Sequence, residues 1–488
     1  MGRHGERHGG EQHGGERHDG TGTAGSARPA DVPAPARAGG RRRPRNRSRA
    51  AALLALGVAA LAMALAMCGF PPEGGDGGAR SGASRAAQVG WGFTHTEYSA
   101  DRGDEAATHG ASELLSADPM PQNQHIMGWG AQNPEPSPGT YDFKELDSRV
   151  DLIRRTGGTP VLTLCCAPDW MKGGKAGTTD WSELEKAPSP EHYEDFAKLA
   201  GTIARRYPDI RHFIVWNELK GFFDEARNRW DHEGYTRLYN LVYKELKKAD
   251  KNNLVGGPYA VMDSYAPGDD TYASDVKGPW GSLDQRTVDA VEYWNAHKAG
   301  ADFVVVDGSS YTKDDRYVPD AFAATRKFAD IGRWLRETTG LPLWWAEWYV
   351  EVADANDDRR GWSEPRRTAT QASALISMTE GGATSGFYWN PQNEGADCPG
   401  CLWRSTRLRD GGGELPMMDL LSRFSRAFPP GTSFEPVDVA ARDRPGLRVL
   451  ADRRTLMVVN TLDRPVRTTV DGRSLTLKPY EIRWLERS

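Results

Sequence analysis

The chain has 488 residues, 38% of them hydrophobic, enough to bury a large core and to form more than one domain. Its formal net charge is −5, and the charges of the segment after residue 88 are mixed in sign, so nothing in the composition indicates nucleic-acid binding. The 16 tryptophans are many for this length. Tryptophan fills cores and also stacks against sugar rings, and the count alone leaves both roles open.

The first 49 residues form a segment of unusual composition. They lack apolar periodicity and are rich in Gly, His, Arg and Pro. Such a composition does not form a packed core, so we expect residues 1–49 to be a disordered tail.

An uncharged run at residues 50–70 follows the arginine-rich segment RRRPRNRSR at 41–49. The run is long enough to cross a bilayer as a helix, and the preceding arginines predict a cytoplasmic tail and an exported remainder. The alternative is a signal peptide cleaved before Gln88. Residues 71–87, rich in Gly, Ser and Ala, are expected to be a flexible linker. The predicted location is therefore the cell membrane, as a single-pass protein with its folded part outside, or alternatively the secreted fraction.

Between residues 88 and 428, short apolar runs alternate with amphipathic helical patterns. Eight such runs, each followed by a helical pattern, predict an α/β fold, the (β/α)8 TIM barrel, with its active site at the carboxyl ends of the strands. A doubly wound sheet is the runner-up, but no glycine-rich phosphate loop follows the first run. The predicted strands are residues 89–93, 126–129, 160–164, 213–216, 254–257, 303–306, 343–346 and 386–389. The helical core positions are Phe143, Leu146, Val150 and Ile153, then Tyr193, Phe196, Leu199 and Ile203, then Phe328, Ile331 and Leu335.

After residue 428 the pattern changes to short alternating runs separated by turn signals such as Asp471-Gly472. This pattern predicts a small C-terminal antiparallel β domain over residues 429–488. We expect it to pack beside the barrel; glycan binding of its own is the alternative. Its predicted strands are residues 447–450, 455–459, 466–470, 475–477 and 482–485.

The cysteines fall into two groups with different expected roles. Cys165 and Cys166 lie in an apolar run and are expected to be small buried hydrophobic residues. Cys398 and Cys401 flank Pro-Gly in a polar loop. Outside the cell they would close a small disulfide, since a zinc site needs two further ligands that the nearby sequence lacks.

Two aromatic-rich apolar runs each carry one glutamate near the C-terminal end: FIVWNE at 213–218 and LWWAEWY at 343–349. A carboxylate is costly in a core, so we expect both at the mouths of their strands. Glycosidic cleavage needs one carboxyl group that protonates the leaving oxygen and one carboxylate that attacks or activates water. The environments of the two must differ so that one keeps its proton. Glu218 and Glu347 are therefore the predicted catalytic pair.

At these residues the chain resembles the clan A (β/α)8 retaining glycoside hydrolases, whose acid/base Glu follows an Asn at strand four and whose nucleophilic Glu ends strand seven. It is most similar to family 39, which includes β-xylosidases, α-L-iduronidases and exopolysaccharide hydrolases. EPSPGTYDF at 135–143 and PDWM at 168–171 support the similarity, which covers residues 88–425. It implies Glu218 as acid/base and Glu347 as nucleophile. The chain departs from the family at Leu219, where a proline is usual.

The resemblance also implies substrate-binding residues, with a packing or rim role as the alternative for each. Asn217 would contact the sugar 2-hydroxyl, Tyr311 would donate to Glu347, and Trp389 would form the floor of a sugar subsite. His95, Trp129 and Trp170 are further substrate-binding candidates, and no cofactor or metal is implied. Glu97, Glu351 and Glu394 are alternative carboxylates if the strand ends are misplaced.

The predicted function is a retaining glycosidase that is anchored in the membrane and cleaves an extracellular or cell-envelope polysaccharide or oligosaccharide. The alternative is a non-catalytic carbohydrate-binding barrel at the cell surface, against which the presence of both glutamates argues. A metal-dependent deacetylase would need a cluster of His and Asp ligands, and Asp169 and Asp307 without neighbouring His do not supply one. The expected partners are a carbohydrate and, through residues 50–70, a membrane.

Overall fold

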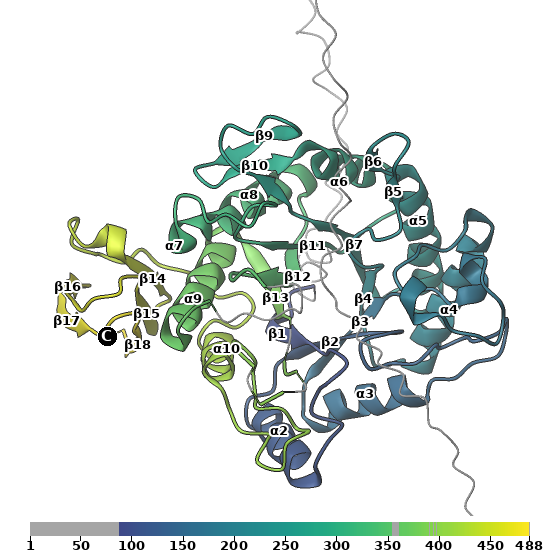
Figure 1. Cartoon of the computed structure of the whole chain (residues 1–488), viewed down its shortest axis with the longest axis horizontal. Coiled ribbons are helices and arrows are strands. Elements are labelled where there is room, and N and C mark those ends of the chain that lie inside the picture. Colours follow the sequence, from purple (N-terminus) through teal and green to yellow (C-terminus); the bar gives the residue numbers. More distant parts are fainter. Residues whose placement is uncertain (1–86, 354–360, 390, 394, 397, 488) are drawn as a thin grey trace, which may run out of the picture.

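Eight parallel strands close into a barrel at the centre of the molecule, and helices surround it (Figure 1). The computed structural model describes residues 87–353, 361–389, 391–393, 395–396 and 398–487. The order around the barrel is β1, β2, β3, β4, β7, β11, β12, β13 and back to β1. This is the (β/α)8 TIM barrel predicted from the sequence. Its strands are β1 (Gly90–Thr94), β2 (Pro121–His125), β3 (Thr159–Leu164), β4 (His212–Val215), β7 (Leu254–Val261), β11 (Phe303–Ser309), β12 (Leu343–Tyr349) and β13 (Ala383–Tyr388).

The helices form the outer layer, with the apolar face of each turned to the barrel. Leu146, Phe196 and Ile331, predicted as helical core positions, are buried on α3, α4 and α8. The helices are α2 (Glu105–Ala117), α3 (Lys144–Arg155), α4 (Tyr193–Arg206), α5 (His232–Ala249), α6 (Gln285–His297), α7 (Ala321–Ala324), α8 (Arg326–Thr339), α9 (Glu364–Glu380) and α10 (Pro416–Ala427). Short strands in the loops are β5 (Phe223–Asp224), β6 (Arg229–Trp230), β8 (Ser264–Tyr265), β9 (Ala273–Gly278) and β10 (Gly281–Asp284).

The second strand corrects the sequence prediction. Residues 126–129 were expected there, but β2 is the polar segment PQNQH, which is buried throughout. Its amides are satisfied inside the protein: Gln122 bonds His95 and Thr156, and Asn123 bonds Thr94. The prediction failed because hydrogen bonding, and not apolarity, makes this segment compatible with burial.

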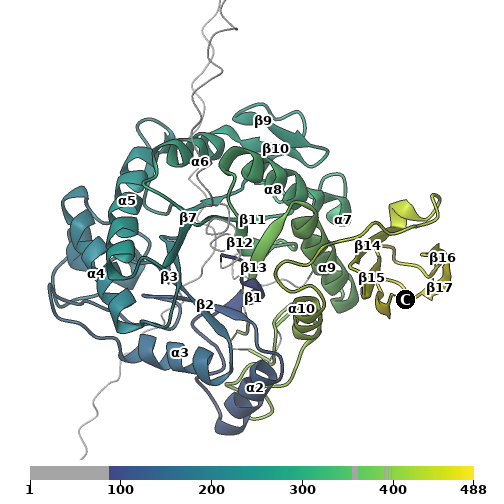
Figure 2. The same cartoon turned by 180° about the vertical axis from the view of Figure 1, so that it is seen from behind.

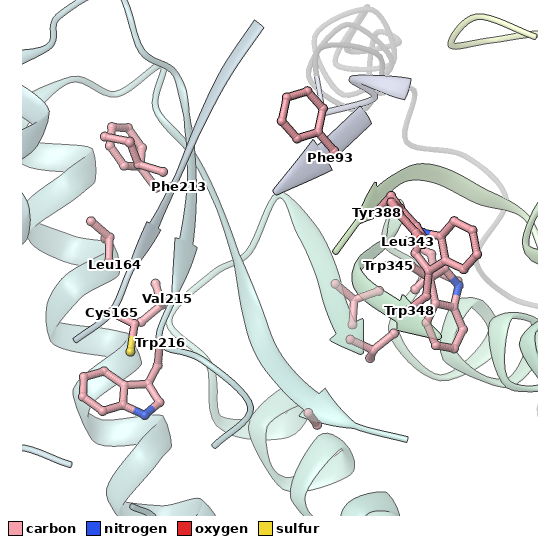
Figure 3. Close-up of a cluster of buried hydrophobic side chains, with 14 of the residues drawn as sticks. Phe93, Leu164, Cys165, Phe213, Val215, Trp216, Leu343, Trp345, Trp348 and Tyr388 are labelled. Carbon is pink, nitrogen blue, oxygen red and sulfur yellow. The ribbon is translucent and has the colours of Figure 1, made fainter. Parts of the chain in front are cut away.

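Apolar side chains fill the inside of the barrel and the layer between barrel and helices. Trp344 stacks on Phe303 inside the barrel, with ring centroids 3.8 Å apart, and its indole N–H donates to the carbonyl of Ala87. In the outer layer Trp345 packs edge-on against Phe328 of α8, and Trp348 against Tyr388. Figure 3 shows Trp345, Trp348 and Tyr388 gathered at one side of this layer. Trp345 and Trp348 share the outer side although they are three residues apart, because the pairing of β12 with β11 skips Ala346 and so interrupts the two-residue period of the strand.

The C-terminal strands lie beside α9, at the edge of the molecule in both views (Figures 1 and 2). They are β14 (Leu447–Ala451), β15 (Thr455–Asn460), β16 (Val466–Val470), β17 (Arg473–Leu477) and β18 (Ile482–Glu486), all antiparallel, as predicted. They form one sheet of three strands and one of two. The Arg448 guanidinium on β14 donates hydrogen bonds to Ser377 and Glu380 of α9.

Both pairs of cysteines form disulfides. The predicted bond between Cys398 and Cys401 is present. Cys165 and Cys166 are buried, as predicted, but they are bonded to each other. The apolarity of the run predicted their burial correctly and carries no information about sulfur pairing.

Among the described residues, no helix is both long and apolar enough to cross a bilayer. The predicted tail, the membrane helix at 50–70 and the linker up to residue 86 lie outside the described residues, as does Glu394.

Candidate active site

Three carboxylates meet at the carboxyl ends of the barrel strands. Glu218 follows β4, Asp307 lies on β11 and Glu347 lies on β12. One oxygen atom from each lies within 4.8 Å of the others. The exposed fractions of the three residues are 8%, 2% and 5%, so the group is shielded from bulk water. The predicted pair is therefore brought together, and a third acid joins it.

The chain makes a left-handed turn after β4 that presents Glu218. Trp216, Glu218 and Leu219 have φ angles of 72°, 49° and 54°. Such values are uncommon outside glycine and store about 1–3 kcal/mol each. The turn also accounts for Leu219, because proline is confined to φ near −65° and cannot adopt this conformation.

Lys220 contacts Glu218 directly. Its Nζ lies 2.7 Å from Glu218 Oε2 and 2.5 Å from Glu185 Oε1, and its side chain is only 18% exposed. Burial acts to raise the pKa of Glu218, but the Lys220 cation and hydrogen bonds from Asp307 and Lys220 outweigh burial and lower this pKa overall. Glu218 is therefore ionised in the resting protein.

Asp307 has the opposite protonation state. Burial first, then the charges of Glu218 and Glu347, raise the pKa of Asp307 well above its ordinary value. The protonated carboxyl group donates a hydrogen bond to Glu218. Sequence reasoning considered Asp307 only as a metal ligand, because nothing in the run VVVDG shows that β11 ends between two glutamates.

Glu347 is held by two tyrosine hydroxyls. Tyr259 Oη lies 3.2 Å from Glu347 Oε2, and the Tyr349 hydroxyl donates to Oε1. Tyr259 has a φ of 56° and sits where the pairing of β7 with β11 skips one residue. A bulge of this kind turns a side chain toward a site. The Tyr259 donor was not predicted from the sequence; the predicted donor Tyr311 packs its ring edge-on to Tyr317, with centroids 6.1 Å apart.

An aromatic wall adjoins the carboxylates and contains two of the predicted tryptophans. Trp129 and Trp389 meet edge-on with centroids 6.1 Å apart, and His125 packs against both. His125 Nε2 is 3.4 Å from Asn217 Oδ1, next to Glu218. Burial is the main cause that lowers the pKa of His125 to about 4, so the ring is neutral. His125 was missed because the second strand was placed after it.

Two predicted substrate-binding residues are engaged elsewhere. His95 has Ser99 on Nδ1 at 2.6 Å and Gln122 on Nε2 at 2.9 Å, in the layer between the barrel and the helices. The Trp170 indole donates to the carbonyl of Glu135 at 2.9 Å and packs edge-on to His192. Both residues support the framework around the site.

The alternative carboxylates Glu97 and Glu351 lie outside the three-carboxylate group. Glu351 is ion-paired with Arg367 at 2.6 Å, and Glu97 is exposed. The spacing of Glu218, Asp307 and Glu347 is also compatible with a metal ion. We do not assign them as metal ligands, because the Lys220 cation already pairs with Glu218 at 2.7 Å.

The comparisons with known proteins bear on the family and the fold of the chain. No family model matches the chain. A curated protein named Beta-xylosidase, from Caldicellulosiruptor saccharolyticus, is 30% identical over 138 residues, which are 26% of this chain and 27% of that protein. The chain is similar to the family 39 glycoside hydrolases. The match thus spans about a quarter of the curated relative and agrees with the resemblance drawn from the sequence, since that family includes β-xylosidases.

Solved structures share the barrel. SrfJ from Salmonella typhimurium has a TM-score of 0.54 at 13% identity, over 82% of this chain and 90% of that chain. A conserved exported protein from Bacteroides fragilis has a TM-score of 0.54 at 12% identity, over 82% of this chain and 96% of that chain. At these identities the two structures confirm the fold.

Proposed function

We propose that this chain is a retaining glycoside hydrolase with Glu347 as nucleophile and Glu218 as acid/base. The observation that carries the proposal is the spacing of the two carboxylates, with oxygen atoms within 4.8 Å. Retaining glycosidases hold their carboxyl groups about 5–5.5 Å apart, whereas inverting enzymes need about 6.5–9.5 Å to fit a water molecule. The short spacing therefore favours a covalent intermediate.

The environments of the two glutamates support these roles. Glu347 is oriented by the hydroxyls of Tyr259 and Tyr349, one at each of its carboxylate oxygens. A carboxylate oriented by neutral donors keeps the electron density needed to attack the anomeric carbon. Glu218 instead contacts Lys220 and a protonated Asp307, the setting of a group that exchanges protons.

The substrate in this proposal is an extracellular or cell-envelope polysaccharide or oligosaccharide. Trp129 and Trp389 supply apolar faces for a sugar ring, and Asn217 supplies an amide next to Glu218. The name of the curated relative makes β-xylosides the first substrates to test.

Hydrolysis by the full chain tests the proposal. We would assay aryl glycosides and bacterial exopolysaccharides with wild type, Glu218→Gln and Glu347→Gln, and with Glu97→Gln as an exposed control. The proposal predicts that hydrolysis is lost or strongly reduced in the first two variants and kept in the control. Glycan binding without hydrolysis by wild type would favour the non-catalytic carbohydrate-binding barrel.

Export through residues 50–70 is a separate part of the proposal. Membrane fractionation should place the intact chain in the pellet, with its folded part accessible to protease from outside the cell. A soluble mature form that begins near Gln88 would instead indicate signal-peptide cleavage and secretion.

A further inference from the structure

The proposed acid/base glutamate lies in surroundings that disfavour its protonated form. Lys220 Nζ contacts Glu218 Oε2 at 2.7 Å, and Asp307 donates to the same carboxylate. A group that must protonate a leaving oxygen needs a proton at the moment of bond cleavage. The resting arrangement therefore raises the question of where that proton is kept.

Asp307 is the carboxyl group placed to hold it. It is 2% exposed, hydrogen-bonded to Glu218 and within 4.8 Å of Glu347 by one oxygen. The other ionisable groups that face it are Asp263, Lys327 and Tyr259. Groups that face Glu218 from its other sides are Lys220 and the neutral ring of His125, with Glu185 behind Lys220.

We propose that Asp307 stores the proton that Glu218 delivers to the leaving oxygen. This inference rests on the proposed retaining hydrolysis and deepens it. As Glu347 bonds to the anomeric carbon and the glycosidic C–O bond breaks, the proton of Asp307 passes to Glu218, and Glu218 passes a proton on to the departing oxygen in the same step. The products of this step are the leaving alcohol, an ester at Glu347, and carboxylates at Glu218 and Asp307.

The second step reverses these transfers. Water bonds to the anomeric carbon, the ester bond to Glu347 breaks, and its electron pair returns to the Glu347 carboxylate. The proton lost by water passes through Glu218 to Asp307. The resting protonation states are restored, and no oxidant or further reactant is needed.

The charge balance explains why the proton moves when it is required. The Glu347 carboxylate is one of the charges that disfavour ionised Asp307 in the resting protein. Formation of the ester removes this charge, so Asp307 ionises as Glu347 becomes neutral. The three side chains keep the same total charge in both states, which avoids adding a charge to a buried site.

Substitution Asp307→Asn in the full chain tests this role. The amide still donates a hydrogen bond to Glu218 but holds no transferable proton. Glycosides with poor leaving groups, such as phenyl glycosides, should lose roughly 10²-fold or more in kcat/KM, the scale of general acid catalysis. Dinitrophenyl glycosides, whose leaving group needs no proton, should be hydrolysed within about tenfold of wild type. The basic limb of the pH profile should move to lower pH. In wild type this limb reports the pH at which the Glu218–Asp307 pair loses its proton, whereas in the variant it reports the lowered pKa of Glu218 alone.

Asp263→Asn is the matched control, since Asp263 is a half-buried carboxyl group whose pKa burial also raises, and it acts on Asp307 only through its charge. It should keep the wild-type dependence on leaving group. If Asp307→Asn does not fold, the smaller Asp307→Ser variant replaces it in the same assay. Equal activity of either Asp307 variant on good and poor leaving groups, with an unmoved basic limb, would overturn the role of Asp307. Failure of wild type to hydrolyse any glycoside would instead overturn the proposed function, and this inference with it.

Discussion

The carboxyl ends of β4 and β12 each present a glutamate to the same space, but the groups that contact the two glutamates differ. After β4, a left-handed turn places Glu218 against the Lys220 cation and the protonated Asp307. On β12, Glu347 receives hydroxyl groups from Tyr259 and Tyr349. A cation and a protonated carboxyl group thus contact Glu218, whereas tyrosine hydroxyls contact Glu347. The difference indicates that proton transfer belongs to the β4 end and bond formation to the β12 end.

Removing the nucleophile should have the largest effect. In Glu347→Gln the amide keeps the size of the side chain but cannot form the glycosyl ester, so hydrolysis should fall by roughly 10⁴-fold or more for every leaving group. Steady-state assays and a thermal unfolding midpoint close to wild type would establish that chemistry, and not folding, is lost. Wild-type-like turnover would remove Glu347 from this role.

Removing the acid/base should have an effect that depends on the leaving group. Glu218→Gln should slow poor leaving groups by roughly 10²- to 10⁴-fold, because only these need protonation. Dinitrophenyl glycosides should still form the intermediate and accumulate it, visible as a burst of product. A uniform loss across leaving groups would contradict the division of roles between the two strand ends.

The hydrogen bonds from tyrosine hydroxyls to Glu347 are tested by Tyr259→Phe. A hydrogen bond to a charged group contributes about 1.5–3 kcal/mol, so loss of this hydroxyl should lower kcat/KM by roughly tenfold or more. Tyr349→Phe, which removes the donor to the other oxygen, is the comparison variant. An unchanged rate in both variants would mean that the hydroxyls do not orient Glu347 in the reaction.

The ion pair between Lys220 and Glu218 is tested by Lys220→Met, which should mainly shift the pH profile of hydrolysis. Lys220 lowers the pKa of Glu218, so its removal should raise this pKa and move the basic limb to higher pH. The maximal rate should change by less than about tenfold, the smallest effect of the series. Lys186→Met is the control. Lys186 is a nearby cation that pairs with Glu183 at 3.4 Å, and its removal should leave the pH profile unchanged. A basic limb that stays in place in Lys220→Met would contradict the electrostatic role of Lys220.

The sequence predicted those parts of the molecule that apolar periodicity determines. Seven barrel strands, the helical core positions on α3, α4 and α8, and the C-terminal strands follow this pattern. The exception is β2, which is buried because its amides are hydrogen-bonded. Since β2 contains no apolar run, the sequence analysis placed the second strand after it and missed His125.

The local surroundings of the glutamates depend on three-dimensional features that periodicity does not contain. Tyr259 reaches Glu347 because of a bulge in β7, two residues beyond the predicted end of that strand. Lys220 reaches Glu218 because of a left-handed turn. Asp307 keeps its proton because the closed barrel buries it and brings the charges of Glu218 and Glu347 beside it. The glutamates were predictable from their strand-end motifs, whereas their partners were not.

The stereochemistry of the first-formed product tests the central claim most directly. Hydrolysis of a glycoside of known anomeric configuration would be followed by proton NMR from the earliest times, before mutarotation mixes the anomers. The short spacing of Glu218 and Glu347 predicts a product with the configuration of the substrate. A first-formed product of inverted configuration would contradict a covalent intermediate at Glu347, and with it the roles assigned to the two strand ends.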